Sequence, residues 1–337
     1  MFILGIVLGF LAAFLQSLCY VISGAYVRRT GRPGWSLASP QQLVMLPFSV
    51  AGVVFLHPPI GEMGSSEIKS LLLWTLLCMV TGYLGNIGLF QMQRFVEPSR
   101  TAPLQSLKIP FIAIMNFLIF GHSFTLMQIA ALIFIVVAAR LLTDSSQGKL
   151  GVVAWAWLIL GVASFALCDI TVGRMLAITE RYSGSVLKNS IFIFALGTLG
   201  TSFVGVLSAV PQMMSRTGMP APSNWLKYVM PYSLIWMISL VMLFVSFSLV
   251  GVLPATMAQS TRALISVFLG WVLARQIGFA DIEKKVSKGV FIRRVLAAVL
   301  IFSAIQLYCK GVEITKVESA DFKVESNNLS NKGENNE

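Results

Sequence analysis

The sequence is poor in charged side chains. Aspartate, glutamate, lysine and arginine together make up 12% of its 337 residues, whereas 56% of the residues are apolar. Soluble domains carry about 25% charged residues, and the mean hydropathy of this chain is +0.79. The composition excludes an ordinary soluble domain. It predicts a multi-pass integral membrane protein, which we expect in the plasma (inner) membrane.

Metal ligands and catalytic motifs are also scarce. The chain has two histidines and four cysteines, and it contains no CxxC, P-loop, GxSxG or GxGxxG sequence. All four cysteines lie in apolar runs, which favours reduced core thiols over disulfides or metal ligands: Cys19, Cys78, Cys168 and Cys309. The sequence therefore predicts no metal site, no cofactor and no catalytic residue, and we do not expect an enzyme.

The charges that are present are mostly positive. There are 25 lysines and arginines against 14 acidic residues, which gives a formal net charge of +11. Most of these cations flank apolar runs, where they bind lipid headgroups and set the membrane topology. We therefore expect a lipid bilayer, and not a nucleic acid, as the partner of the basic residues.

Ten apolar runs predict ten transmembrane helices, because about 20 apolar residues span the hydrocarbon core of a bilayer. They cover residues 3–26, 39–56, 70–92, 101–120, 125–142, 151–174, 190–210, 230–250, 253–274 and 293–309. Residues 1–142 and 151–309 then form two five-helix units joined by a linker at 143–150. Residues 310–337 are polar and are predicted to be a disordered tail.

Two short sequence matches relate the two units. The sequence QSLK at 105–108 recurs 154 positions later as QSTR at 259–262, and LCYV at 18–21 matches LCDI at 167–170, 149 positions later. Five helices is an odd number, so the second unit enters the membrane from the opposite side. The matches therefore predict an inverted repeat, an architecture found in many secondary transporters.

This architecture, with polar and proline-bearing fourth and ninth helices, resembles the drug/metabolite transporter superfamily and its EamA-type repeats. The resemblance covers residues 2–309. Many members end the fourth helix in Gly-Glu, whereas this chain has Gly121-His122, so no role of that glutamate is carried over. A closer likeness is to the sugar-phosphate and nucleotide-sugar branch, in which basic residues on these two helices bind phosphate. Lys108 and Arg262 occupy comparable places, although that branch's signatures on the ninth helix are absent.

Two arguments about orientation disagree. Lysines and arginines concentrate in the odd-numbered loops, so the positive-inside rule places both termini outside the cell. Resemblance to the superfamily implies cytoplasmic termini. An even number of helices requires only that both termini share one side.

The recurring sequence places a cation in the middle of the fourth apolar run and another in the middle of the ninth. A lysine at the centre of a bilayer costs roughly 2.5–3.5 kcal/mol on insertion scales and needs a partner or a function. Pro110 should kink the helix beside Lys108, because proline leaves the Ser106 carbonyl without its usual donor. We expect Lys108 and Arg262 to bind an anion together, with Gln105 and Gln259 orienting it. The alternative is that both cations only neutralise Asp169 or extend toward the membrane surface.

Asp169 is the one carboxylate deep within an apolar run. It is either a counter-ion to Lys108 or Arg262, or a group that takes up a proton during transport. Polar side chains on the first and third helices could face the same cavity or form hydrogen bonds in the core: Gln16, Tyr20, Tyr83 and Asn86. Of these, we include Tyr20, together with Asp169, among the substrate-binding residues.

Together these features predict a secondary transporter that moves a small anionic or zwitterionic metabolite by alternating access. Proton coupling and exchange against a second substrate both fit the sequence, and the oligomeric state is left open. Two rivals are a membrane-embedded lipid-handling protein and a non-transporting subunit of a membrane assembly. The first needs a nucleophile, a metal cluster or paired carboxylates in the membrane, and the second needs another chain to pair the buried charges.

Overall fold

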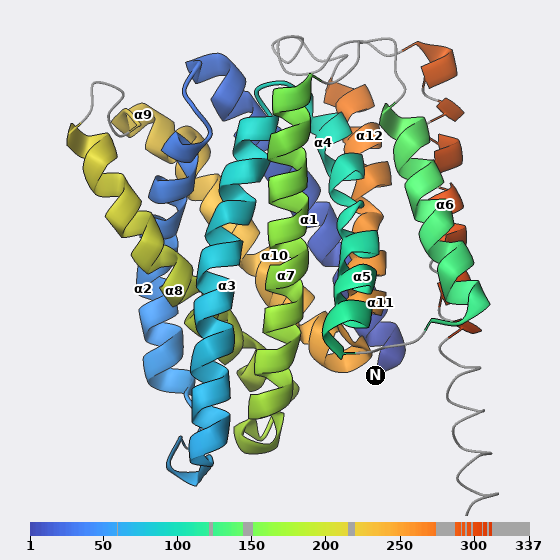
Figure 1. Cartoon of the computed structure of the whole chain (residues 1–337). Helices are drawn as coiled ribbons and strands as arrows, with labels where there is room; N and C mark the ends of the chain where they lie inside the picture. The colour runs from blue at the N-terminus through green and yellow to red at the C-terminus, as the bar shows by residue number, and fades with distance from the viewer. Residues whose placement is uncertain are drawn as a thin grey trace, which may run out of the picture.

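The structure is a computed structural model that describes residues 1–58, 60–120, 124–143, 151–214 and 220–273, and most of residues 287–311. Within these ranges the chain forms helices and no strand. The helices stand side by side and alternate in direction (Figure 1). Nine described segments are long and apolar enough to cross a membrane, and a further apolar helix, Leu126–Ala138, is shorter. The prediction of an all-α membrane protein is confirmed.

The described helices form two groups in the sequence, before and after residues 144–150. The first contains α1 (Phe2–Thr30), α2 (Trp35–Leu56), α3 (Ser65–Met92), α4 (Pro98–Gln105), α5 (Lys108–Phe120) and α6 (Leu126–Thr143), with a 3-10 turn at Ile60–Glu62. The second contains α7 (Val152–Ser183), α8 (Val186–Met214), α9 (Pro222–Asn224), a π-helical turn at Trp225–Val229, α10 (Met230–Val250), α11 (Val252–Ser260), α12 (Arg262–Leu273) and a last helix at Lys288–Tyr308. The linker from residue 144 and the tail from residue 312 lie outside the described residues.

Several helices are longer than the apolar runs that predict them. The sequence places the end of the sixth helix at residue 174, but α7 continues to Ser183, where Gly184 adopts the left-handed conformation with φ 69°. The reason is that an apolar run measures the hydrocarbon thickness and not the length of the helix. Beyond the apolar run the helix continues, and Arg181 near its end pairs with Glu67 of α3 at 2.8 Å.

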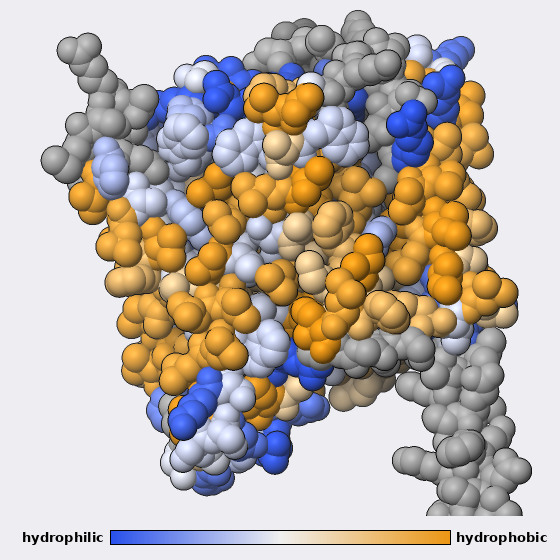
Figure 2. Space-filling view, in the orientation of Figure 1, coloured by the Kyte–Doolittle hydropathy of each residue, from blue (hydrophilic) through white to orange (hydrophobic). Residues whose placement is uncertain are grey.

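Apolar side chains cover the middle of the outer surface. Figure 2 shows a broad apolar zone between more hydrophilic ends. On α3, for example, Leu72, Leu73 and Leu76 are 64%, 55% and 54% exposed. Exposed leucines in such numbers suit contact with lipid chains, so the fold agrees with a multi-pass membrane protein.

The fourth and ninth transmembrane segments are each interrupted near the middle. Between α4 and α5 the Ile109 N–H donates to the Ser106 carbonyl at 3.1 Å. In a regular α-helix this carbonyl would accept from the N–H of residue 110, which proline lacks. The sequence predicts a kink at this point, and the structure shows a break one turn before the proline. Thr261 alone separates α11 from α12. Lys108 and Arg262 are the first residues of the helices that follow the two breaks.

Helices of the two units pack against one another in corresponding pairs. α3 packs along α7 and α1 along α10, while α2 packs on α8 and α4 on α12. α1 also contacts α12, as α7 contacts α5. When the two units are exchanged, α3–α7 corresponds to α1–α10, α5–α7 corresponds to α1–α12, and α2–α8 corresponds to itself. α3 and α7 approach closely, since a Cβ atom added to Gly88 would lie 2.6 Å from the Gly161 Cα.

Candidate functional site

A cavity of about 70 Å³ lies between the two units. Residues from both units line it, including all six residues that the sequence predicts as substrate-binding: Tyr20, Gln105, Lys108, Asp169, Gln259 and Arg262. The side chains at 108 and 262 reach it because each begins a helix at a break in its transmembrane segment. The structure therefore brings the predicted residues together.

Lys108 and Asp169 form a buried ion pair at the wall of this cavity. The Lys108 Nζ donates to Asp169 Oδ2 at 2.6 Å, and the two side chains are 4% and 9% exposed. Charge-assisted hydrogen bonds of this kind are short and stronger than neutral ones. The contact joins α5 to α7, and it favours the counter-ion role of Asp169 with Lys108, and not Arg262, as its partner.

Arg262 is held by neutral groups. Its Nη1 donates to Gln16 Oε1 at 2.9 Å, its Nη2 donates to the Gln105 carbonyl at 3.2 Å, and its guanidinium lies 5.7 Å from the centre of the Tyr20 ring. No ion pair of Arg262 occurs among the described residues. Arg262 as a whole is 3% exposed, so the guanidinium lies inside the helix bundle without a carboxylate contact among the described residues.

Amide side chains complete the polar side of the cavity. Gln16 Oε1 also accepts a hydrogen bond from Gln259 Nε2 at 2.7 Å. Four buried polar atoms of lining residues have no partner among the described residues: Asn86 Oδ1, Gln105 Nε2, Gln259 Oε1 and Arg262 Nε. An unsatisfied buried polar group costs about 1–3 kcal/mol. These donors and acceptors are therefore placed to bind a polar ligand or water.

Among the other polar candidates, Gln16 and Asn86 line the cavity whereas Tyr83 does not. The Tyr83 hydroxyl instead contacts Ser39 and Ser208, so it belongs to the hydrogen-bonded core. Gln16 is the functional candidate that the sequence-based selection missed. Its polarity within an apolar helix was the available signal, but its contact with Arg262 joins residues 246 positions apart.

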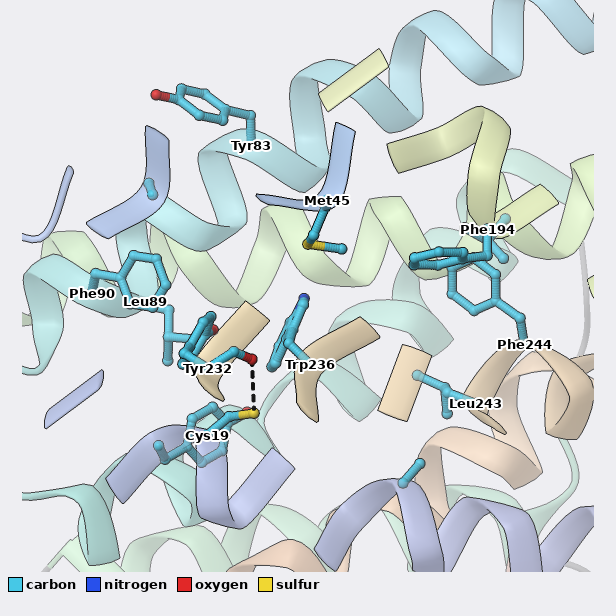
Figure 3. Packing of buried hydrophobic residues seen from close by; sticks show 14 of the residues in the cluster. Cys19, Met45, Tyr83, Leu89, Phe90, Phe194, Tyr232, Trp236, Leu243 and Phe244 are labelled. Atoms are coloured by element: carbon cyan, nitrogen blue, oxygen red, sulfur yellow. Dashed lines mark hydrogen bonds between the residues drawn. The ribbon is translucent and has the colours of Figure 1, made fainter. Parts of the chain in front are cut away.

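The opposite side of the cavity is apolar and aromatic. Its walls include Met45, Phe165, Phe194, Trp236 and Phe244, four of which are labelled in Figure 3. Charged lining side chains comprise Lys108, Asp169 and Arg262, whose formal charges sum to +1. The site thus combines a positively charged polar end with an aromatic wall, which suits a small molecule that bears an anionic group.

A second, larger cavity of about 670 Å³ follows along α7 and α10. It is lined by Arg174, Glu180, Arg181 and Asn189, together with Phe247. The Phe244 ring lines the central cavity. Its centroid lies 5.9 Å from that of Phe247, on which it stacks, and 6.3 Å from that of Phe194, which it meets edge to face. The linings of the two cavities therefore meet at the contact between Phe244 and Phe247.

Comparison with known proteins agrees with the fold. Residues 3–144 match the family model of the EamA-like transporter family, which confirms over these residues the predicted resemblance to the drug/metabolite transporter superfamily. A solved protein, described only as a crystal structure of a protein, covers 92% of this chain and 98% of its own, with a TM-score of 0.53 and 14% identity. That identity shows a shared fold alone. No curated protein matches the sequence.

Proposed function

We propose that the chain is a secondary transporter that carries a small anionic or zwitterionic metabolite across a membrane by alternating access. The observation that carries the proposal is Arg262, whose charge is held by Gln16 and the Gln105 carbonyl and is not neutralised by a carboxylate. Because Lys108 is offset by Asp169, the guanidinium leaves the cavity with one uncompensated positive charge. An anionic group on the ligand supplies the missing partner.

The interrupted helices support the same assignment. The N-terminus of a helix carries a partial positive charge and unpaired N–H groups, and transporters use such half-helix ends to bind anionic groups. Here α5 and α12 begin at the cavity-lining residues Lys108 and Arg262. The Ile109 N–H donates to the Ser106 carbonyl and the Leu264 N–H to the Thr261 carbonyl, so the helix dipoles support the positive potential of the guanidinium without supplying these N–H groups to a ligand.

Alternating access is supported by the inverted repeat that we propose for the two units. The α3–α7 pair corresponds to the α1–α10 pair when the units are exchanged, and both units contain an interrupted helix that begins again with a cation. A site between two such units can open to one side and then to the other as the units rock. We infer that the larger cavity, which Phe247 lines, is one of these routes.

Of the rivals, the assembly subunit needs a partner chain for its buried charges. The Lys108–Asp169 pair is formed within the chain, which weakens that alternative. The unpartnered polar atoms around the cavity also fit a small ligand better than a protein surface, since they line an internal space.

The test is transport by purified protein in liposomes, with a panel of small carboxylates, phosphate esters and amino acids. Arg262→Gln should lower uptake of the substrate roughly 30-fold or more, since a desolvated charge contact is worth about 2 kcal/mol or more. The matched control is Lys188→Gln, because Lys188 is an exposed cation at the start of α8. Full uptake of the anion by Arg262→Gln would sink the proposal.

A further inference from the structure

Two cysteine side chains of the central cavity lie against each other. Cys78 comes from α3 and Cys168 from α7, and their Sγ atoms are 3.7 Å apart. Both are free thiols, and both line the cavity. Two soft donors from different helices therefore meet at one point of an internal space, where they take no part in the anion site described above.

Glycines leave room around both sulfurs. A Cβ atom added to Gly197 would lie 3.1 Å from the Cys78 Sγ, and one added to Gly82 would lie 3.5 Å from the Cys168 Sγ. Metal–sulfur bonds of bound metal ions are about 2.3 Å long, so two sulfurs on either side of one ion lie roughly 4.6 Å apart. The thiols would thus have to separate by a little under 1 Å, which a change of side-chain torsion beside these glycines provides.

The charge of the cavity suits one particular class of ion. Thiolates prefer soft metal ions such as copper(I). When two thiols bind one monovalent ion, each sulfur loses a proton and forms one metal–sulfur bond, and the product carries one negative charge. No electron is transferred and two protons are released. The formal charge of +1 from Lys108, Asp169 and Arg262 compensates that product.

We propose that Cys78 and Cys168 form a two-thiolate site for a soft monovalent metal ion of the copper(I) class. The bound ion links α3 to α7 and occupies part of the central cavity. Binding at this site does not require that the chain transports anything. It would in addition block any cycle in which α3 and α7 must separate around the cavity.

The probe is silver(I), which has the same charge and softness and is stable in air. The protein is the full chain with Cys19→Ser and Cys309→Ser, so that only the pair remains. Cys19 is the matched control thiol in a complementary variant that retains it. It is buried, but it lies outside the cavity lining and donates to the Tyr232 carbonyl (Figure 3). We expect one tightly bound silver ion per chain, measured by mass spectrometry of the metal after gel filtration against a competing thiol.

Replacing either cysteine of the pair by serine should weaken silver binding roughly 100-fold or more. The ion then keeps one metal–sulfur bond to the protein and loses the second, which the linked helices otherwise provide within the same molecule. The complementary variant, Cys78→Ser with Cys168→Ser and the other two cysteines retained, should bind no silver under this competition. Unchanged affinity in either single-serine variant would overturn the proposal.

A second measurement uses protein with both thiols in place, so it is independent of how the serine variants fold. Silver should protect both Cys78 and Cys168 from alkylation by N-ethylmaleimide. The alkylated peptides of both cysteines should then be missing from the same digest. Zinc(II), which prefers four ligands, should protect neither. Protection of only one of the two cysteines would contradict a shared site.

Discussion

Lys108 and Arg262 occupy corresponding positions, yet their surroundings differ. Each is the first residue of a helix that follows a break in a transmembrane segment. Lys108 contacts a carboxylate oxygen at 2.6 Å, whereas Arg262 contacts an amide oxygen and a backbone carbonyl. A carboxylate cancels the charge of its partner, but a neutral acceptor only orients it. We therefore propose that Lys108 joins the two units and that Arg262 holds the ligand.

The largest effect is expected on the Lys108 side. Asp169→Asn leaves a buried ammonium group without its carboxylate, and breaking such a pair costs roughly 3–5 kcal/mol of unfolding free energy. The measurement is the thermal unfolding midpoint of the purified protein in detergent. Lys108→Met combined with Asp169→Asn should recover most of the loss, whereas Arg262→Gln combined with Asp169→Asn should not. Strictly additive losses for Lys108→Met and Asp169→Asn would show that the two side chains are not coupled.

A single substitution can make the Arg262 side resemble the Lys108 side. Gln16→Glu places a carboxylate where Arg262 now has an amide oxygen, and it lowers the formal charge of the cavity from +1 to zero. Anion uptake should fall roughly 30-fold, the equivalent of about 2 kcal/mol for one buried charge contact, with little change in the unfolding midpoint. Gln16→Met removes the acceptor without adding charge and should reduce uptake less. Equal losses of uptake in both variants would mean that the charge of the cavity does not determine binding of the anion.

The smallest effect separates the charge of Arg262 from its shape. Arg262→Lys keeps the charge, but one ammonium group cannot span both the Gln16 amide oxygen and the Gln105 carbonyl as the guanidinium does. Loss of one charge-assisted hydrogen bond corresponds to about 1.5 kcal/mol, or roughly tenfold in apparent affinity. Initial uptake rates across a substrate concentration series measure it. An unchanged apparent affinity would show that the fork geometry is unimportant.

How far the sequence predicts the site depends on which contacts are local. The recurring QSLK and QSTR segments locate both cations and both neighbouring glutamines, because their depth in an apolar run can be read directly. The partners of the cations cannot be read in this way. From the sequence, Asp169 could pair with either cation, and the packing of α5 on α7 is what brings it to Lys108. Gln16 accepts a hydrogen bond from Arg262 because α1 contacts α12.

The fold shows the same division. Apolar runs predict the transmembrane segments, including the interruption near Pro110. They underestimate helices such as α7, because residues 175–183 are too polar for the bilayer core but remain helical. Interruption of the ninth segment at Thr261 was not predicted. No proline occupies the position after it that Pro110 has in the fourth segment, so the break has no comparable local signal.

The three rings of Phe194, Phe244 and Phe247 have an electrical consequence. Phe194 and Phe244 line the central cavity, Phe247 lines the wide cavity with Arg174 and Arg181, and the rings contact one another. Apolar constrictions dewet, which interrupts a continuous column of water. We therefore expect these rings to stop inorganic ions and protons between the two cavities, and a membrane that contains this protein to keep its voltage.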